Sequence, residues 1–418
     1  MHEAVSLDEQ ARAILRRNDR GGYTVPTSGL YPYQWNWDSA FAALGFARFD
    51  PERAWLELET LFSGQWTNGM VPHIVFHEYA EGYFPGPAVW GTDTDPPSSG
   101  ISQPPVAATS ARALFERHPD IGRERLPALM PKFLAWHRWF MENRAESGAI
   151  AAIHPWETGR DNAPDWDRAI LRVDTSGVGE YTRHDISHVA PDMRPTKADY
   201  DAYLALVNFG AACGWDEDEI RRGGPFRVAD PTLTFTLLRA CRDLAFLAGE
   251  LGRDTAEVDG WTDRLVDGAA TLWNPEARHY DARDLRSGEL SGSLSNASFL
   301  CWFAGLDSAD MLDRYREVNS AVRYGVPSFS PGSPAFNPRR YWRGPAWAMM
   351  NALIGIGLAD AGHRREAEKL RRDTRELIGK SGFAEYYDPC DGTPAGGEDF
   401  TWTAAVWLAW ASPNAEGR

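Results

Sequence analysis

Cysteine is scarce in this sequence. Only four cysteines occur in 418 residues, and they are far apart: Cys213, Cys241, Cys301 and Cys390. A disulfide scaffold needs a dense set of cysteines, and structural zinc sites are usually built from closely spaced pairs. The sequence therefore predicts four reduced thiols, with neither disulfides nor zinc organising the fold.

Positive charge is also in short supply. The chain has 43 Lys and Arg against 59 Asp and Glu, a formal net charge of −16. Nucleic-acid binding depends on a surplus of basic side chains, so this class of partner is excluded. No apolar run is long enough to span a bilayer, and the first residues lack the apolar core of a secretory signal. We therefore expect a cytoplasmic protein without nucleic-acid or membrane partners, and nothing indicates an oligomeric state.

The sequence also lacks linkers and repeats. No Ser/Gly-rich stretch, charge block or change in composition marks a boundary, so we predict one domain over residues 1–418. Apolar residues recur three and four positions apart along most of the chain, which predicts about a dozen helices. Their expected ranges are Val5–Arg17, Asp38–Phe49, Pro51–Phe62, Pro104–His118, Leu126–Arg144, Lys197–Cys213, Pro231–Leu251, Ala256–Trp273, Ser308–Arg323, Gly344–Ala361, Arg364–Ile378 and Thr401–Ala411.

The helices differ in amphipathicity, and the segments between them are long. Phe235–Ala248 is apolar almost throughout, whereas Arg364–Ile378 is charged on one face, which indicates buried inner and half-exposed outer helices. Long loops in a compact domain are usually functional. We therefore predict an all-α fold, an (α/α)6 barrel or double helical toroid, with a loop-built cap over an active site at one end.

Two acidic residues lie in settings suited to ligand binding. Asp161 follows Trp156 and Gly159 and precedes Asn162 and Pro164, while Glu385 is flanked by Phe383, Tyr386 and Tyr387. Two separated carboxylates are what inverting glycoside hydrolysis requires. The 18 tryptophans suit the flat faces of sugars, although most tryptophans in a helical protein pack in its core. The sequence thus favours a sugar-cleaving enzyme.

Four motifs occur in order along the chain. They are Tyr-x-x-x-Trp-x-x-Asp-Ser from Tyr31 to Ser39, Glu-x-Gly-x-Asp-Asn-x-Pro from Glu157 to Pro164, Tyr-Trp-Arg-Gly-Pro-x-Trp from Tyr341 to Trp347, and Glu-Tyr-Tyr-Asp-Pro from Glu385 to Pro389. Together they resemble glycoside hydrolase family 63 and, more distantly, the trehalases. The short, single-domain chain looks most like the bacterial mannosylglycerate and glucosylglycerate hydrolases of that family.

The resemblance implies roles for individual residues. Asp161 matches the general acid, whose pKa must be raised by burial or by a neighbouring acid, for which Glu157 is the obvious candidate. Glu385 matches the general base that orients water, with Glu398 as the second candidate. Arg194 and Tyr200 resemble glycerate-binding positions. The positions matching sugar-binding residues are Tyr31, Trp35, Asp38, Tyr83, Gln103, Tyr341, Trp342 and Trp347, and Glu398 is a possible further sugar contact.

No cofactor or metal is expected. His73 and His77 are four residues apart, as are His184 and His188, but neither pair encloses the Glu of a helical zinc-protease motif. The predicted function is inverting hydrolysis of a small α-hexoside, mannosylglycerate or glucosylglycerate, to hexose and glycerate. Two alternatives remain: a neutral-disaccharide α-glucosidase of the same family, and a sugar isomerase or epimerase on the same toroid. A third, a carbohydrate-binding protein without catalysis, is disfavoured because both acids are present.

Overall fold

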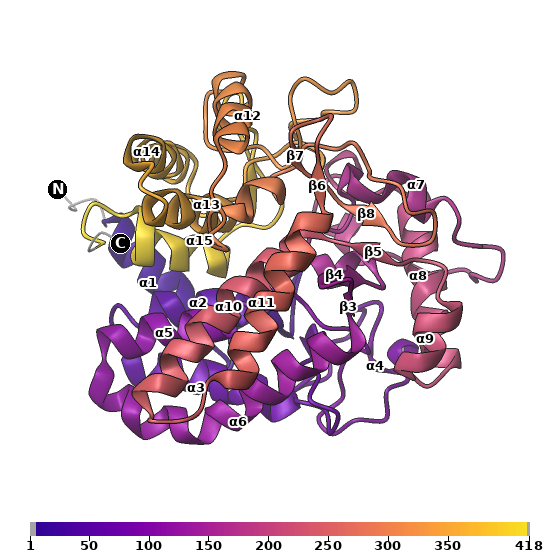
Figure 1. Ribbon diagram of the computed structural model, residues 1–418, viewed down its shortest axis with the longest axis horizontal. Coiled ribbons are helices and arrows are strands. Elements are labelled where there is room, and N and C mark those ends of the chain that lie inside the picture. Colours follow the sequence, from indigo (N-terminus) through magenta and orange to yellow (C-terminus); the bar gives the residue numbers. More distant parts are fainter. Residues whose placement is uncertain (1–5, 416–418) are drawn as a thin grey trace.

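The computed structural model describes residues 6–415 and is mostly helical (Figure 1). The helices are α1 Leu7–Asn18, α2 Asn36–Phe46, α3 Pro51–Leu61, α4 Pro87–Trp90, α5 Ala107–Arg117, α6 Pro119–Asn143, α7 Asp167–Ile170, α8 Lys197–Ala212, α9 Glu217–Gly223, α10 Pro231–Glu250, α11 Ala256–Thr271, α12 Ala309–Ser320, α13 Ala348–Asp360, α14 Arg364–Ser381 and α15 Thr401–Val406. A π-helical turn, Trp407–Ala411, continues α15. The predicted helices are therefore confirmed within a few residues at most ends; Val5 lies outside the described residues.

Several helices begin where the sequence offers a capping side chain. Asp50 accepts from the Arg53 amide ahead of Pro51 at the start of α3, and Asp230 accepts from the Leu233 amide ahead of Pro231 at the start of α10. An acidic cap satisfies an amide that the helix leaves unpaired, and proline in the first turn forgoes no helical hydrogen bond. Asp-Pro pairs thus fix these helix starts.

Contacts between elements separate inner from outer helices. Ten of the eleven residues of α2 are buried, whereas only six of the eighteen residues of α14 are. Among the inner elements, each contacts the next in a closed order: α2, α5, α10, the 3₁₀ turn Ser298–Cys301, α13, α15 and again α2. The outer helices α1, α3, α6, α11, α12 and α14 each contact a member of this series. The predicted division into buried and half-exposed helices is confirmed.

Strands are short and lie mainly in the interhelical segments. A four-stranded antiparallel sheet has the order β3 (Ala145–Glu146), β4 (Ala149–Ala152), β5 (Val228–Ala229) and β8 (Arg283–Asp284). Three two-stranded ribbons pair β1 (Gln34–Trp35) with β2 (Ile74–Val75), β6 (Trp273–Asn274) with β7 (His279–Tyr280), and β9 (Tyr386–Tyr387) with β10 (Pro394–Ala395). Within residues 6–415, no helix combines the length and apolarity needed to cross a membrane.

Candidate active site

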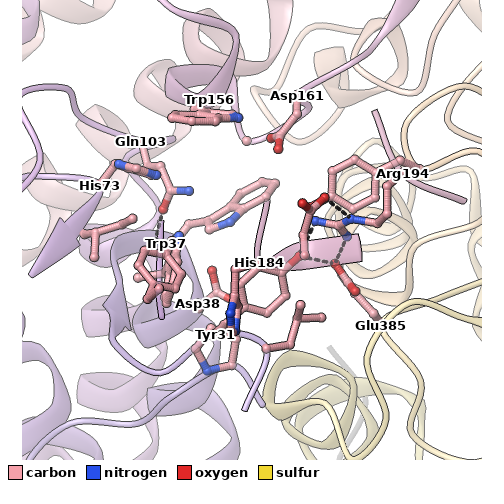
Figure 2. A pocket seen from close by; sticks show the side chains of 18 of the residues that line it. Tyr31, Trp37, Asp38, His73, Gln103, Trp156, Asp161, His184, Arg194 and Glu385 are labelled. Atoms are coloured by element: carbon pink, nitrogen blue, oxygen red, sulfur yellow. Dashed lines mark hydrogen bonds and ion pairs between the residues drawn. The ribbon is translucent and has the colours of Figure 1, made fainter. Parts of the chain in front are cut away.

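One pocket gathers most of the predicted site residues. It holds about 760 Å³ of empty space, part of which is open to solvent. Trp342, Trp347 and Glu398 are the predicted residues that do not line it. Those that do are Tyr31, Trp35, Asp38, Tyr83, Gln103, Asp161, Arg194, Tyr200, Tyr341 and Glu385. Figure 2 shows Asp161 and Glu385 entering the pocket from different sides, Asp161 next to Trp156 and Glu385 next to Arg194.

Asp161 lies on a tight turn that follows the 3₁₀ turn Pro155–Thr158. Gly159 has φ +70°, and an added Cβ would lie 2.5 Å from Cζ2 of Trp37, so this position needs glycine. The Asp161 carbonyl accepts hydrogen bonds from Tyr203 Oη at 2.9 Å and Trp166 Nε1 at 3.1 Å. The backbone is thus fixed while the carboxyl group faces the pocket. Burial, more than the charges of Glu385 and Asp185, raises the pKa of Asp161 to about 7.

Glu157 is not the neighbour that raises the pKa of Asp161, which corrects the prediction. Its carboxylate is fully buried, pairs with Arg144 at 3.2 Å and accepts from the Ile153 amide at 2.9 Å, and Glu157 does not line the pocket. Arg160 is also turned away, pairing with Asp165 at 3.1 Å and Asp230 at 2.8 Å. Because Asp230 caps α10, Arg160 ties the turn that carries Asp161 to the start of an inner helix.

Glu385 lies immediately before β9 and is fully buried. Its Oε1 accepts from Tyr31 Oη at 3.1 Å and lies 3.5 Å from Arg194 Nη1, while Oε2 accepts from the Gly397 amide at 2.8 Å. Burial raises the pKa of Glu385, but the Arg194 charge and these hydrogen bonds act in the opposite direction. Donors on both oxygens favour the carboxylate form.

The first turn of α2 contributes Asp38 to the lining of the pocket. Asp38 is buried and, among the described residues, its Oδ1 has no hydrogen-bond partner. Burial, together with the nearby charge of Glu385, raises the pKa of Asp38 well above its usual value. Gln103 Oε1 accepts from the Trp37 amide at 3.2 Å. Asp38 is therefore left with an unpaired polar atom at the pocket, as expected for a group that binds sugar hydroxyls.

Arg194 lies at the centre of a polar network in the long segment before α8. Its Nε donates to Asp185 at 3.1 Å and its Nη2 donates to Tyr31 Oη at 2.8 Å. Its Nη1 makes no hydrogen bond within residues 6–415, although it lies near Glu385. Tyr200 also lines the pocket, with the central carbon of the Arg183 guanidinium 3.9 Å from the centroid of its ring.

Three residues predicted to contact the sugar do not line the pocket. Trp342 and Trp347 are fully buried and stack on each other, with ring centroids 3.9 Å apart, and the ring of Tyr341, a pocket residue, makes edge contacts with both. Consecutive aromatic residues in a loop carry no periodicity that would show which of them reaches a ligand. Glu398 is exposed and lies outside the pocket, with its backbone carbonyl held by Thr27 Oγ1 at 2.6 Å.

Several pocket residues were not singled out from the sequence as binding positions. They are Trp37, His73, Trp156, His184, Asp185 and Trp402. Of the two histidines, His73 bonds Ser99 Oγ at 2.9 Å, and His184 bonds the Gly29 carbonyl at 2.9 Å. Trp37 lies within the first motif and Trp156 immediately precedes the second, so closeness to the motifs is the signal that the sequence offers for these two residues. Among residues 6–415, no group of three or more His, Cys, Asp or Glu could hold a metal ion.

Comparison with known proteins identifies the family of this chain. Residues 31–403 match the mannosylglycerate hydrolase MGH1-like glycoside hydrolase domain. A mannosylglycerate hydrolase of Thermus thermophilus is 45% identical over 96% of this chain and 99% of its own length. This chain belongs to glycoside hydrolase family 63. It is accordingly a glycoside hydrolase.

A second relative and a solved structure are also similar to this chain. A glucosylglycerate hydrolase of Mycolicibacterium hassiacum is 35% identical over 97% of both chains. The crystal structure of a family-63 mannosylglycerate hydrolase from Thermus thermophilus, in complex with Tris and D-glycerate, superposes with a TM-score of 0.94 and 45% identity, covering 96% of this chain and 99% of that one. The similarity thus extends over nearly the whole of each chain.

Proposed function

We propose that this family-63 hydrolase cleaves mannosylglycerate or glucosylglycerate, with inversion, to a hexose and glycerate. The observation that carries the proposal is the pairing of unlike carboxyl groups in one pocket. Asp161 has a pKa of about 7, whereas Glu385 receives donors on both oxygens. Two carboxyl groups in unlike surroundings, one that favours the proton and one whose hydrogen bonds favour the carboxylate, are the expected arrangement for an acid and a base.

In the proposed reaction, protonated Asp161 donates its proton to the glycosidic oxygen as the bond to the anomeric carbon breaks. Ionised Glu385 accepts a proton from water, whose oxygen attacks the anomeric carbon from the opposite face. The hexose leaves with inverted configuration and the glycerate leaves with its hydroxyl restored. Trp35, Trp37 and Trp156 offer aromatic faces to the sugar, and Asp38 and Gln103 offer polar atoms.

We further propose that the architecture is a single-domain (α/α)6 toroid. The closed series of inner contacts and the outer helices that lie against it support this arrangement. Segments that precede the inner helices contribute Trp35, Gln103, Tyr341 and Phe400 to the pocket, which therefore opens where inner helices start. The cap consists of interhelical segments that contribute Phe84, Pro85, His184 and Arg194.

Glycerate is the proposed aglycone because of Arg194. Arg194 lines the pocket, and its Nη1 makes no hydrogen bond within residues 6–415, although Glu385 Oε1 lies 3.5 Å away; a substrate carboxylate would supply an acceptor. Charge-assisted hydrogen bonds of this kind are about twice as strong as neutral ones. The names of the mannosylglycerate and glucosylglycerate hydrolases at 45% and 35% identity point the same way.

Release of free hexose from a substrate panel tests the proposal. The panel contains mannosylglycerate, glucosylglycerate, kojibiose, trehalose and maltose, and proton NMR at early times identifies the anomer first formed. We expect rapid release from one or both glycerate substrates, with the β-anomer appearing first. Preferential release from a neutral disaccharide would instead support the α-glucosidase alternative. Interconversion of free sugars without any hydrolysis would support the isomerase.

The pH dependence of kcat/KM should report the ionisation of the Asp161 carboxyl group. Only the protonated form can act as the acid, so activity falls as pH rises through its pKa of about 7. We expect a basic limb near pH 7, with kcat/KM decreasing about tenfold per pH unit above it. Asp161→Asn should lose this limb, because the amide does not titrate. A basic limb that persists unchanged in the residual activity of Asp161→Asn would assign it to another group.

A further inference from the structure

The open end of the β9–β10 hairpin is built around Glu385. Tyr386 pairs with Ala395 in the ribbon, so Glu385 and Gly396 are the next residues beyond it on the two strands. The Glu385 amide donates to the Gly397 carbonyl at 2.8 Å, and the Gly397 amide donates back to Glu385 Oε2 at 2.8 Å. The same residue thus fixes both the backbone and the carboxylate of Glu385.

Gly396 has no space for a side chain. A Cβ built on it would lie 2.3 Å from Glu385 Oε2 and 2.6 Å from a ring carbon of Tyr386, and its φ is +75°. Real Cβ atoms do not approach other heavy atoms this closely, so the Glu385 carboxylate would have to move. The carboxylate therefore lies directly against the glycine backbone.

The turn formed by residues 396–399 cannot easily move away from Glu385, because hydrogen bonds hold its other side. Thr27 Oγ1 donates to the Glu398 carbonyl at 2.6 Å, and Asn18 Nδ2 donates to the Asp399 carbonyl at 2.9 Å. On the hairpin side, Trp402 Nε1 donates to the Glu385 carbonyl at 3.2 Å. The turn is therefore held between the N-terminal segment and the start of α15.

We propose that Gly396 and Gly397 are positioning residues for the general base: the missing side chain at 396 and the amide of 397 hold Oε2, so that the carboxylate keeps the orientation needed to activate water. This inference rests on the proposed role of Glu385. Arg194 and Tyr31 act on the other oxygen, and the charged or titratable groups Asp38 and Asp161 also face Glu385. Placement of a base within a fraction of an ångström is what such contacts provide.

Gly396→Ala and Gly382→Ala make a matched pair. Both glycines have left-handed backbones, with φ of +75° and +71°, but a Cβ at Gly382 has no described atom within 4 Å. Both variants therefore place alanine at a positive φ, and only Gly396→Ala presses on Glu385. We expect Gly396→Ala to lower kcat at least about tenfold, with KM changed less than about twofold. Gly382→Ala should keep kcat within about twofold of the parent.

A second readout distinguishes positioning from general damage. Losing the Gly397 bond to the ionised carboxylate should move the acidic limb of kcat/KM to higher pH in Gly396→Ala, while the basic limb stays in place. Equal kcat in the parent and Gly396→Ala, or a loss matched by Gly382→Ala, would overturn the proposal. If Gly396→Ala does not fold, replacing the Gly397 amide by an ester decides by the same criteria, because it removes only the N–H that binds Glu385 Oε2. Failure of the parent to hydrolyse any glycoside would instead count against the proposed function.

Discussion

We expect Glu385→Gln to lower kcat by about 10²- to 10⁴-fold, the usual contribution of a general base. Glutamine has nearly the same shape, so its side-chain oxygen can still accept from Gly397 or Tyr31, but it cannot take a proton from water. The fold should be retained, with a near-parental thermal unfolding midpoint. Steady-state release of hexose from mannosylglycerate or glucosylglycerate measures the loss.

The control for this variant is Glu398→Gln. Glu398 belongs to the turn that holds Glu385 but is exposed and outside the pocket, so its amide variant should retain parental kcat. Near-parental turnover by Glu385→Gln would mean that another group activates the water. A loss in Glu398→Gln as large as that in Glu385→Gln would show that the turn, and not the carboxylate of Glu385, determines turnover.

A substrate with a good leaving group distinguishes the loss of the general acid from the loss of the general base. Asp161→Asn should also lower kcat on the glycerate substrates by about 10²-fold or more. Fluoride needs little protonation to depart, so Asp161→Asn should regain most of its activity on an α-hexosyl fluoride. Glu385→Gln should remain slow on the same fluoride, because its defect lies in the attacking water. The reverse pattern would exchange the two roles.

The helices were predictable because their apolar spacing reflects burial. The exceptions have physical causes. The helix expected from Leu126 begins at Pro119, and Pro127 and Pro131 lie inside it, although internal proline removes a backbone hydrogen bond. Packing of its buried face, with Trp136 and Phe140 fully enclosed, outweighs that cost. The inner element at Ser298–Cys301 is a single 3₁₀ turn, too short to show any period.

The two carboxylates of the site could be predicted, but their environment could not. Asp161 and Glu385 stand out because aromatic residues, glycine and proline surround them. The sequence does not show that Glu157, four residues before Asp161, pairs with Arg144, or that Asp185 and Arg194 approach from the cap. Such pairings join residues brought together only by tertiary structure. The same limit explains why Trp342 and Trp347 were placed in the pocket.

The second large effect is expected at Arg194. Arg194→Lys retains the charge but loses the planar guanidinium group. That group donates hydrogen bonds to Asp185 and Tyr31 and lies 3.5 Å from Glu385. Both an acidic substrate and its neutral glycerol counterpart should therefore be cleaved more slowly. The acidic substrate loses in addition a hydrogen bond between charged groups, worth about 1.5–3 kcal/mol. We expect kcat/KM for the glycerate substrate to fall about 10- to 150-fold further than for the glycerol analogue.

Arg183→Lys is the matched control for this measurement. Arg183 binds the same Asp185 carboxylate, at 2.7 Å, and comes from the same cap segment, but it does not line the pocket. If Arg194 contacts the aglycone carboxylate, only Arg194→Lys changes the ratio of kcat/KM between the acidic and neutral substrates. Disturbance of the cap alone would slow both substrates equally in both variants. A constant ratio in Arg194→Lys would therefore confine Arg194 to supporting Tyr31 and Glu385, and would favour a neutral-disaccharide α-glucosidase within the same family.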